Sequence, residues 1–175
     1  VLHGVEIPAA GGDTLWCDMA AVHDDLSPAM QRFLAGLRAE HDLRQGFGFL
    51  QDGSQVERLE ALRQADRDSN RALHPVVWRH PSSDRPLLYV NASFTRRIVD
   101  LSPAESDTLL GYLVGLANRP DYQLRLRWQP GTVVIWDNWR TQHFACGDHY
   151  PAYREMQRVT VADDGRRTVQ QESAA

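Results

Sequence analysis

Short stretches in which apolar and polar residues alternate, together with one continuously apolar stretch, recur along the chain and predict β-strands. Segments rich in proline, glycine and aspartate separate them and indicate turns. So many short strands, with a few helical segments between them, favour a mostly β fold of the sandwich or jelly-roll class with helical insertions. The stretches that we interpret as strands are residues 1–7, 14–17, 38–43, 74–81, 87–90, 94–99, 122–128, 132–136 and 159–161.

Two serine–proline pairs predict the starts of helices. Ser27–Pro28 and Ser102–Pro103 each place a hydroxyl at the N-cap and a proline in the first turn, and Glu105 adds a capping box to the second. We also expect a short helix at 18–26 and a solvated helix at 55–71. Apolar residues at helical spacing should pack in the core. These are Met30, Phe33, Leu34 and Leu37 in the first helix, and Leu109, Leu110, Leu113, Val114 and Leu116 in the second.

The composition is that of a soluble globular protein. A chain of 175 residues can bury one core, so we expect a single domain over residues 1–175, with a polar, frayed tail at 164–175. The net charge of −4 gives no electrostatic reason to bind nucleic acid or an anionic membrane. No apolar run reaches membrane length, and Cys17 and Cys146 form no disulfide framework, so we expect a cytoplasmic protein. The sequence does not determine the number of subunits, and a homo-oligomer is one of the open alternatives.

The candidate chemistry lies in residues 136–158. His143 carries an imidazole that can ligate a transition metal, although a lone histidine is more often a hydrogen-bonded core or surface residue. Arg154 and Arg158 are four residues apart, so on a strand both would face the same side. Two unpaired guanidinium groups facing an interior would be costly unless an anion met them. The alternative is a pair of surface ion pairs with acids such as Glu155 or Asp148.

Five motifs spread over nearly the whole chain carry a family resemblance. The most specific is W-D-N-x-x-T-x-H, followed by the spaced arginines. The motifs lie at residues 11–16 (GGDTLW), 26–42, 74–81, 94–100 and 136–145 (WDNWRTQHFA). Through them the chain resembles the TauD/TfdA family of Fe(II)- and 2-oxoglutarate-dependent dioxygenases, and within it the taurine dioxygenase branch. The resemblance implies a double-stranded β-helix, which is a jelly roll, here incomplete at its N-terminal end.

The resemblance also implies roles for particular residues. His143 matches the distal histidine of an iron-binding 2-His-1-carboxylate triad. Arg154 matches the arginine that binds the far carboxylate of 2-oxoglutarate, and Thr14 matches the hydroxyl that shares this carboxylate. Arg158 matches the arginine that binds the anionic head of the substrate. Two aromatic residues match those around the substrate, namely Phe47 and Phe94.

The chain departs from the family at its front. The family takes its other two iron ligands from an H-x-D motif, which we expect shortly before Val1. The H-x-D of this chain, residues 23–25, falls in a predicted helix, where positions i and i+2 do not face the same way. We interpret it as a solvated helix end. Because the chain also lacks an initial methionine, we expect that an upstream part was cut away and that this fragment alone is inactive.

The resemblance implies an enzyme that uses Fe(II), 2-oxoglutarate and O2. It would hydroxylate a small anionic substrate, such as taurine, an alkyl sulfonate or an alkyl sulfate, and release succinate and CO2. Two alternatives stay open. The chain could be a jelly-roll module that binds anions without catalysis. It could also be an inactive truncated fragment whose missing strands a partner chain supplies.

Overall fold

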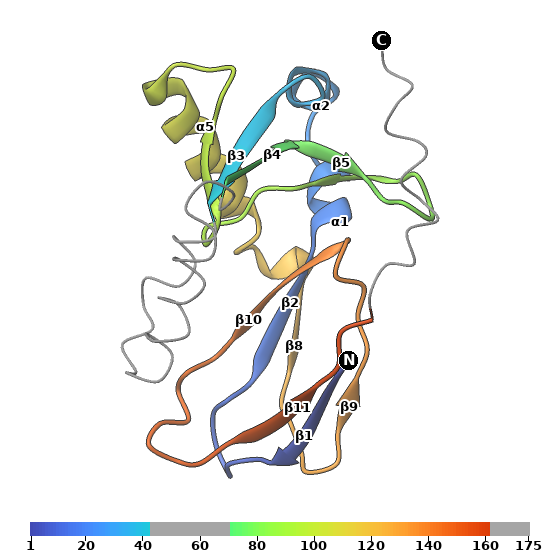
Figure 1. The fold of residues 1–175 in the computed structure, drawn as a ribbon, viewed down its shortest axis with the longest axis vertical. Helices are drawn as coiled ribbons and strands as arrows, with labels where there is room; N and C mark the ends of the chain where they lie inside the picture. Colours follow the sequence, from blue (N-terminus) through green and yellow to red (C-terminus); the bar gives the residue numbers. More distant parts are fainter. Residues whose placement is uncertain (43–70, 162–175) are drawn as a thin grey trace.

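The computed structural model describes residues 1–42 and 71–161, which form many short strands and a few helices (Figure 1). This agrees with the mostly β class that the alternation predicts. The helical elements are α1 (Met19–Asp24), α2 (Pro28–Leu34), α5 (Pro103–Leu116) and the short 3-10 helix η1 (Pro120–Tyr122). The strands are β1 (Leu2–Glu6), β2 (Thr14–Asp18), β3 (Arg38–Asp42), β4 (Arg71–Pro75), β5 (Val77–Arg79), β6 (Pro86–Leu88), β7 (Thr95–Ile98), β8 (Gln123–Leu126), β9 (Val133–Val134), β10 (Thr141–Ala145) and β11 (Glu155–Arg158).

Two antiparallel sheets in the lower half of Figure 1 join the two ends of the described chain. One sheet has the order β11-β1-β9 and the other the order β10-β2-β8. β1 and β2 therefore lie in different sheets, and β8 to β11 alternate between the two sheets, as strands do in a jelly roll. In the second sheet His143 lies opposite Trp16 and Ala145 lies opposite Thr14. This register decides which side chains of β2 and β10 share a face.

The hydrophobic core lies in the other half of the molecule. There α1, α2 and α5 pack with the sheet β4-β3-β7 and the hairpin β5-β6. Apolar side chains from all of these parts are almost completely buried. Examples are Met19, Val22, Leu34, Val76, Leu88, Ile98 and Leu113. The core thus lies beside the two sheets of the lower half.

The helix starts are those that the sequence predicts. Ser27 precedes α2, and its hydroxyl accepts a hydrogen bond from the backbone N–H of Met30 at 3.3 Å. Ser102 and Glu105 form the capping box of α5, in which the Ser102 N–H donates to Glu105 Oε2 at 2.9 Å. At α1 the carboxylate of Asp18 caps the helix and is paired with Arg140. This pairing ties the start of α1 to the segment that leads into β10.

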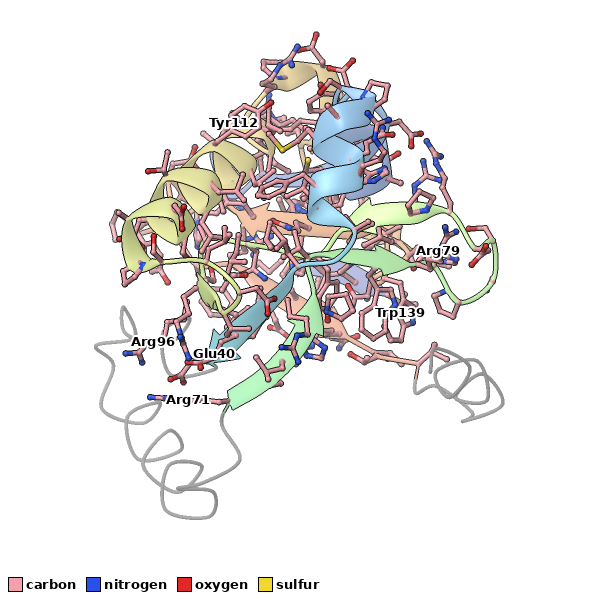
Figure 2. All side chains as sticks on the ribbon, turned by 90° about the horizontal axis from the view of Figure 1, so that it is seen from above. Glu40, Arg71, Arg79, Arg96, Tyr112 and Trp139 are labelled. Carbon is pink, nitrogen blue, oxygen red and sulfur yellow. The ribbon has the colours of Figure 1, made fainter. Side chains whose placement is uncertain are left out.

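Charged side chains join the strands of the upper sheet. Glu40 on β3 is largely buried, and its carboxylate pairs with Arg97 at 3.1 Å and with Arg71 at 3.6 Å. Figure 2 shows Glu40 between Arg71 and Arg96 at the outer end of the sheet. Asp42, two residues further on, also faces Arg71, at 3.6 Å. A buried carboxylate needs such partners, and these cations come from the two neighbouring strands, β4 and β7.

Three predictions from the pattern are wrong. Phe33 is 50% exposed, because the two-turn helix α2 buries fully only Leu34. Residues 159–161 are not a strand, because β11 ends at Arg158. The backbone N–H of Val159 still donates a hydrogen bond of 3.0 Å to the carbonyl of Val1, the first residue of the chain. His23 is 6% exposed and packs inward from α1, so it is not a solvated helix end. The two aspartates that follow it do lie at the helix end, paired with arginines.

Some predictions fall outside the described residues. These are the helix at 55–71 (except Arg71, which belongs to β4), Phe47, and the tail at 164–175. Among the described residues, none of the helices has the length and the apolar character that a membrane span requires.

Candidate active site

A cavity of about 410 Å³ lies where the two lower sheets face each other. Side chains of β2 and β10 line one wall, and side chains of β1 and β11 line the other. Side chains alternate along a strand, and this explains why every second residue of a strand lines the cavity. Arg154, Met156 and Arg158 share one face of the β11 segment and line the cavity, as the spacing predicts. Thr14 and His143 line the same cavity. The fold therefore brings together four of the six predicted site residues.

His143 packs against an aromatic ring, although the residue as a whole is exposed. It lies opposite Trp16 in the β2–β10 register, and its ring centroid is 5.3 Å from that of Trp136. Burial of the ring, and then the positive charge of Arg158, lower the pKa of His143 below its usual value. Both effects favour the neutral imidazole, which is the form that offers a lone pair to a metal ion. A neutral imidazole at the cavity can serve as a metal ligand, and this role of His143 stays a prediction.

Arg154 carries a charge that the described residues do not neutralise. Its Nε and Nη2 atoms are buried and have no hydrogen-bond partner there. Of the two acids that the sequence offered as alternatives, Asp148 instead accepts from the Gly12 N–H at 2.8 Å and lies 4.0 Å from Arg125. Glu155 accepts from the hydroxyl of Tyr153 at 3.1 Å. Buried donors without partners are costly, and a guanidinium more so than a neutral group. The two nitrogen atoms therefore fit a carboxylate bound in the cavity.

Thr14 is buried, with 2% of its surface exposed. Its Oγ1 accepts a hydrogen bond of 2.9 Å from Nε1 of Trp128. Arg158, by contrast, is exposed at the end of β11 and forms no ion pair with another described residue. The cavity thus offers one enclosed cation, one enclosed hydroxyl and a second cation that solvent can reach.

Phe94 lies outside this cavity. It lines an adjoining one of about 350 Å³, which His143 also lines. Phe94 and Arg154 therefore line different cavities, and His143 lines both. Phe47, the other predicted aromatic residue, lies outside the described residues.

A complete iron centre is not formed by residues 1–42 and 71–161. No three side chains of histidine, cysteine, aspartate or glutamate converge among them. His143 can supply one donor, and His23 belongs to α1 in the core, away from the cavity lining. The residues present fit the carboxylate of a cosubstrate, whereas they do not by themselves fit an iron ion.

Sequence reasoning missed three residues that shape the site. Gly12 has a φ of 73° and lies against Arg154. Trp128 binds Thr14 across 114 residues of sequence. His80 lies 2.6 Å from Asp137 through its Nε2, and so anchors the turn that precedes β10. No pattern in the sequence predicts these contacts. A tryptophan beside a proline–glycine turn, as at 128–131, is at most a weak indication of a buried site residue.

Comparison with known proteins points to one family. The family model described as "Taurine catabolism dioxygenase TauD, TfdA family" matches residues 1–160. An alkylsulfatase of Acinetobacter baylyi is 33% identical over 165 residues, which cover 94% of this chain and 52% of that protein. An alpha-ketoglutarate-dependent sulfonate dioxygenase of Saccharomyces cerevisiae is 38% identical over 158 residues, covering 89% of this chain and 36% of that one.

Solved structures show the same relationship. A taurine dioxygenase from Burkholderia xenovorans superposes with a TM-score of 0.73 at 32% identity, over 89% of this chain and 48% of that one. The chain thus spans about half the length of such relatives, or less. The expected jelly-roll fold is confirmed by this likeness. The family match covers almost the whole sequence, and so this chain belongs to the TauD, TfdA family.

Proposed function

We propose that this chain is the cosubstrate-binding and anion-binding part of an Fe(II)- and 2-oxoglutarate-dependent dioxygenase. The observation that carries the proposal is the pair of buried, unpartnered nitrogen atoms of Arg154 in a cavity that Thr14 also lines. The substrate would be a small organic anion, in particular a sulfonate or a sulfate ester. The names of two relatives, a sulfonate dioxygenase and a sulfate ester dioxygenase, support this class.

In this proposal Arg154 and Thr14 bind the far carboxylate of 2-oxoglutarate. A guanidinium presents two parallel N–H groups to a carboxylate, and such charge-assisted bonds are stronger than neutral ones. The cavity encloses the Arg154 nitrogen atoms, so water would screen the pair little. The carboxylate in turn would satisfy donors that otherwise stay unpaired.

Arg158 binds the anionic head of the substrate. It lies two strand repeats beyond Arg154 on the same face, and it is exposed where Arg154 is enclosed. An arginine open to solvent can meet a substrate that arrives after the cosubstrate. Phe94, in the adjoining cavity beside His143, would contact the carbon part of that substrate.

His143 would supply one iron ligand, and the described residues do not provide the others. A bound iron ion would supply, with O2, the oxidation of a substrate C–H bond, with succinate and CO2 as the products of the cosubstrate. The chain itself would hold the two anions in place, and the buried nitrogen atoms of Arg154 would keep the cosubstrate carboxylate away from water. We further propose a cytoplasmic protein, because both cysteines are free.

One observation favours a second function: the described residues contain no cluster of three metal ligands. The chain would then be a module that binds anions without catalysis. Calorimetric titration with 2-oxoglutarate, without O2 and with or without Fe(II), separates the two in the whole polypeptide that contains this chain. The proposal expects tighter binding with Fe(II), and succinate once O2 and an alkyl sulfonate or sulfate are added. Binding that is indifferent to Fe(II), with no succinate formed, would favour the module.

A further inference from the structure

We infer that Trp128 is a positioning residue, whose indole N–H orients the Thr14 hydroxyl so that this hydroxyl donates its proton to the far carboxylate of 2-oxoglutarate. The inference rests on the proposed function. It adds a residue that does not line the cavity and that acts only through Thr14.

The direction of the hydrogen bond between the two residues is fixed by chemistry. Trp128 Nε1 and Thr14 Oγ1 are 2.9 Å apart. An indole N–H can only donate, so the Thr14 oxygen must accept. Trp128 is 3% exposed and Thr14 is 2% exposed, so water does not compete for this bond.

Once its oxygen accepts from Trp128, the hydroxyl of Thr14 has its own proton left to donate. Among the described residues, no other group forms a hydrogen bond with this hydroxyl. Because Thr14 lines the cavity together with Arg154, a bound ligand is the available acceptor. The enclosed end of the cavity would then present only donors, namely the Thr14 O–H and the Arg154 Nε and Nη2 groups. Such a site selects an ionised carboxylate and disfavours a group that carries donors of its own, such as an amide.

The fold explains why Trp128 reaches Thr14. Leu126, the last residue of β8, pairs with Thr14 in the sheet register, and Trp128 follows two residues later. Its ring is held beside that of Trp16, with centroids 6.3 Å apart. The sheet register and the ring of Trp16 therefore hold the indole near Thr14.

A double-mutant cycle tests the inference in the whole polypeptide. The variants are Trp128→Phe, Thr14→Val and the two combined, and calorimetry measures their affinity for 2-oxoglutarate with Fe(II) and without O2. Trp128→Phe should weaken binding by about 3- to 10-fold, as expected for one neutral hydrogen bond. In the Thr14→Val background the same change should have no further effect, because the hydroxyl that Trp128 orients is gone. A control ligand is 2-oxobutanoate, which lacks the far carboxylate, and its affinity should not change.

The outcomes are distinct. The positioning role would be overturned if the two substitutions weakened 2-oxoglutarate affinity independently, so that their fold-changes multiply in the double variant. It would also be overturned if Trp128→Phe weakened 2-oxobutanoate affinity equally. In both cases the proposed function stands. If the unchanged protein does not bind 2-oxoglutarate, the proposed function fails and the inference fails with it. If Trp128→Phe does not fold, the indole is replaced by benzothiophene, which keeps the shape and lacks the N–H, and the same cycle decides.

Discussion

Gly12 lies directly against Arg154. A Cβ atom added to Gly12 would be 3.1 Å from Cδ and 3.2 Å from Nε of that arginine. Gly12 also has a φ of 73°, a conformation that side chains disfavour. The Gly11–Gly12 turn therefore does more than reverse the chain before β2. It leaves the space in which the guanidinium of Arg154 can turn toward the cavity.

Gly12→Ala should weaken 2-oxoglutarate binding several-fold, because the added methyl group displaces the Arg154 side chain. It should also lower the free energy of unfolding by about 1–2 kcal/mol through backbone strain. Calorimetry and chemical denaturation measure the two effects. Gly36→Ala is the matched control, since a Cβ there meets nothing within 4 Å. A Gly12→Ala variant with unchanged affinity would show that the turn does not position Arg154.

Arg158→Ala should impair the coupling of substrate oxidation to 2-oxoglutarate consumption more than it impairs 2-oxoglutarate binding. The reason is that Arg158 is exposed at the cavity, whereas Arg154 is enclosed in it. The measurement is the ratio of product formed to succinate formed, beside the dissociation constant of 2-oxoglutarate. Arg79→Ala, at a surface arginine paired with Asp84, is the control. Equal losses of coupling and of 2-oxoglutarate affinity would mean that the two arginines are not divided between two anions.

Acid should destabilise the protein in part through His41. Burial, and then the charge of neighbouring His74, lower the pKa of His41 to about 4. A histidine in an unfolded chain titrates near 6.5, so the folded state holds this ring neutral and the unfolded state protonates first. The stabilisation is complete above about pH 6.5 and is lost as the pH falls toward 4.

Denaturation curves between pH 7 and pH 4 measure this effect. His41→Gln should flatten the loss of stability across that window, because the variant cannot be protonated at this position. Leu73→Gln, at an exposed position of the adjacent strand β4, should keep the slope of the unchanged protein. If His41→Gln keeps that slope as well, His41 does not account for the acid sensitivity.

Local patterns predicted much of the fold. Alternation is a property of neighbouring residues, and it located strands such as β1, β2 and β8 within a few positions. The Ser27 and Ser102 caps were equally local. The strand expected at 159–161 failed because a strand also needs a partner, and β1 pairs instead with residues 155–158. Alternation contains no information about the partner.

The candidate site was predictable only where a motif carried it. His143, Arg154 and Arg158 fall in a stretch that the family resemblance makes specific, and their shared cavity agrees with it. The residues that contact these site residues could not be predicted from the sequence. The contact of Gly12 with Arg154 and that of Trp128 with Thr14 each join residues more than 100 positions apart. Such pairs depend on sheet register, which is set by the whole fold.

The central claim is that Arg154 binds the far carboxylate of 2-oxoglutarate. Its most direct test is the dissociation constant of 2-oxoglutarate for the whole polypeptide with Fe(II) and without O2, compared with that of Arg154→Ala. A charge-assisted bidentate pair contributes roughly 1.5–3 kcal/mol, so the variant should bind at least about tenfold more weakly. Its affinity for 2-oxobutanoate should equal that of the unchanged protein. An Arg154→Ala variant that binds 2-oxoglutarate with unchanged affinity would contradict the claim.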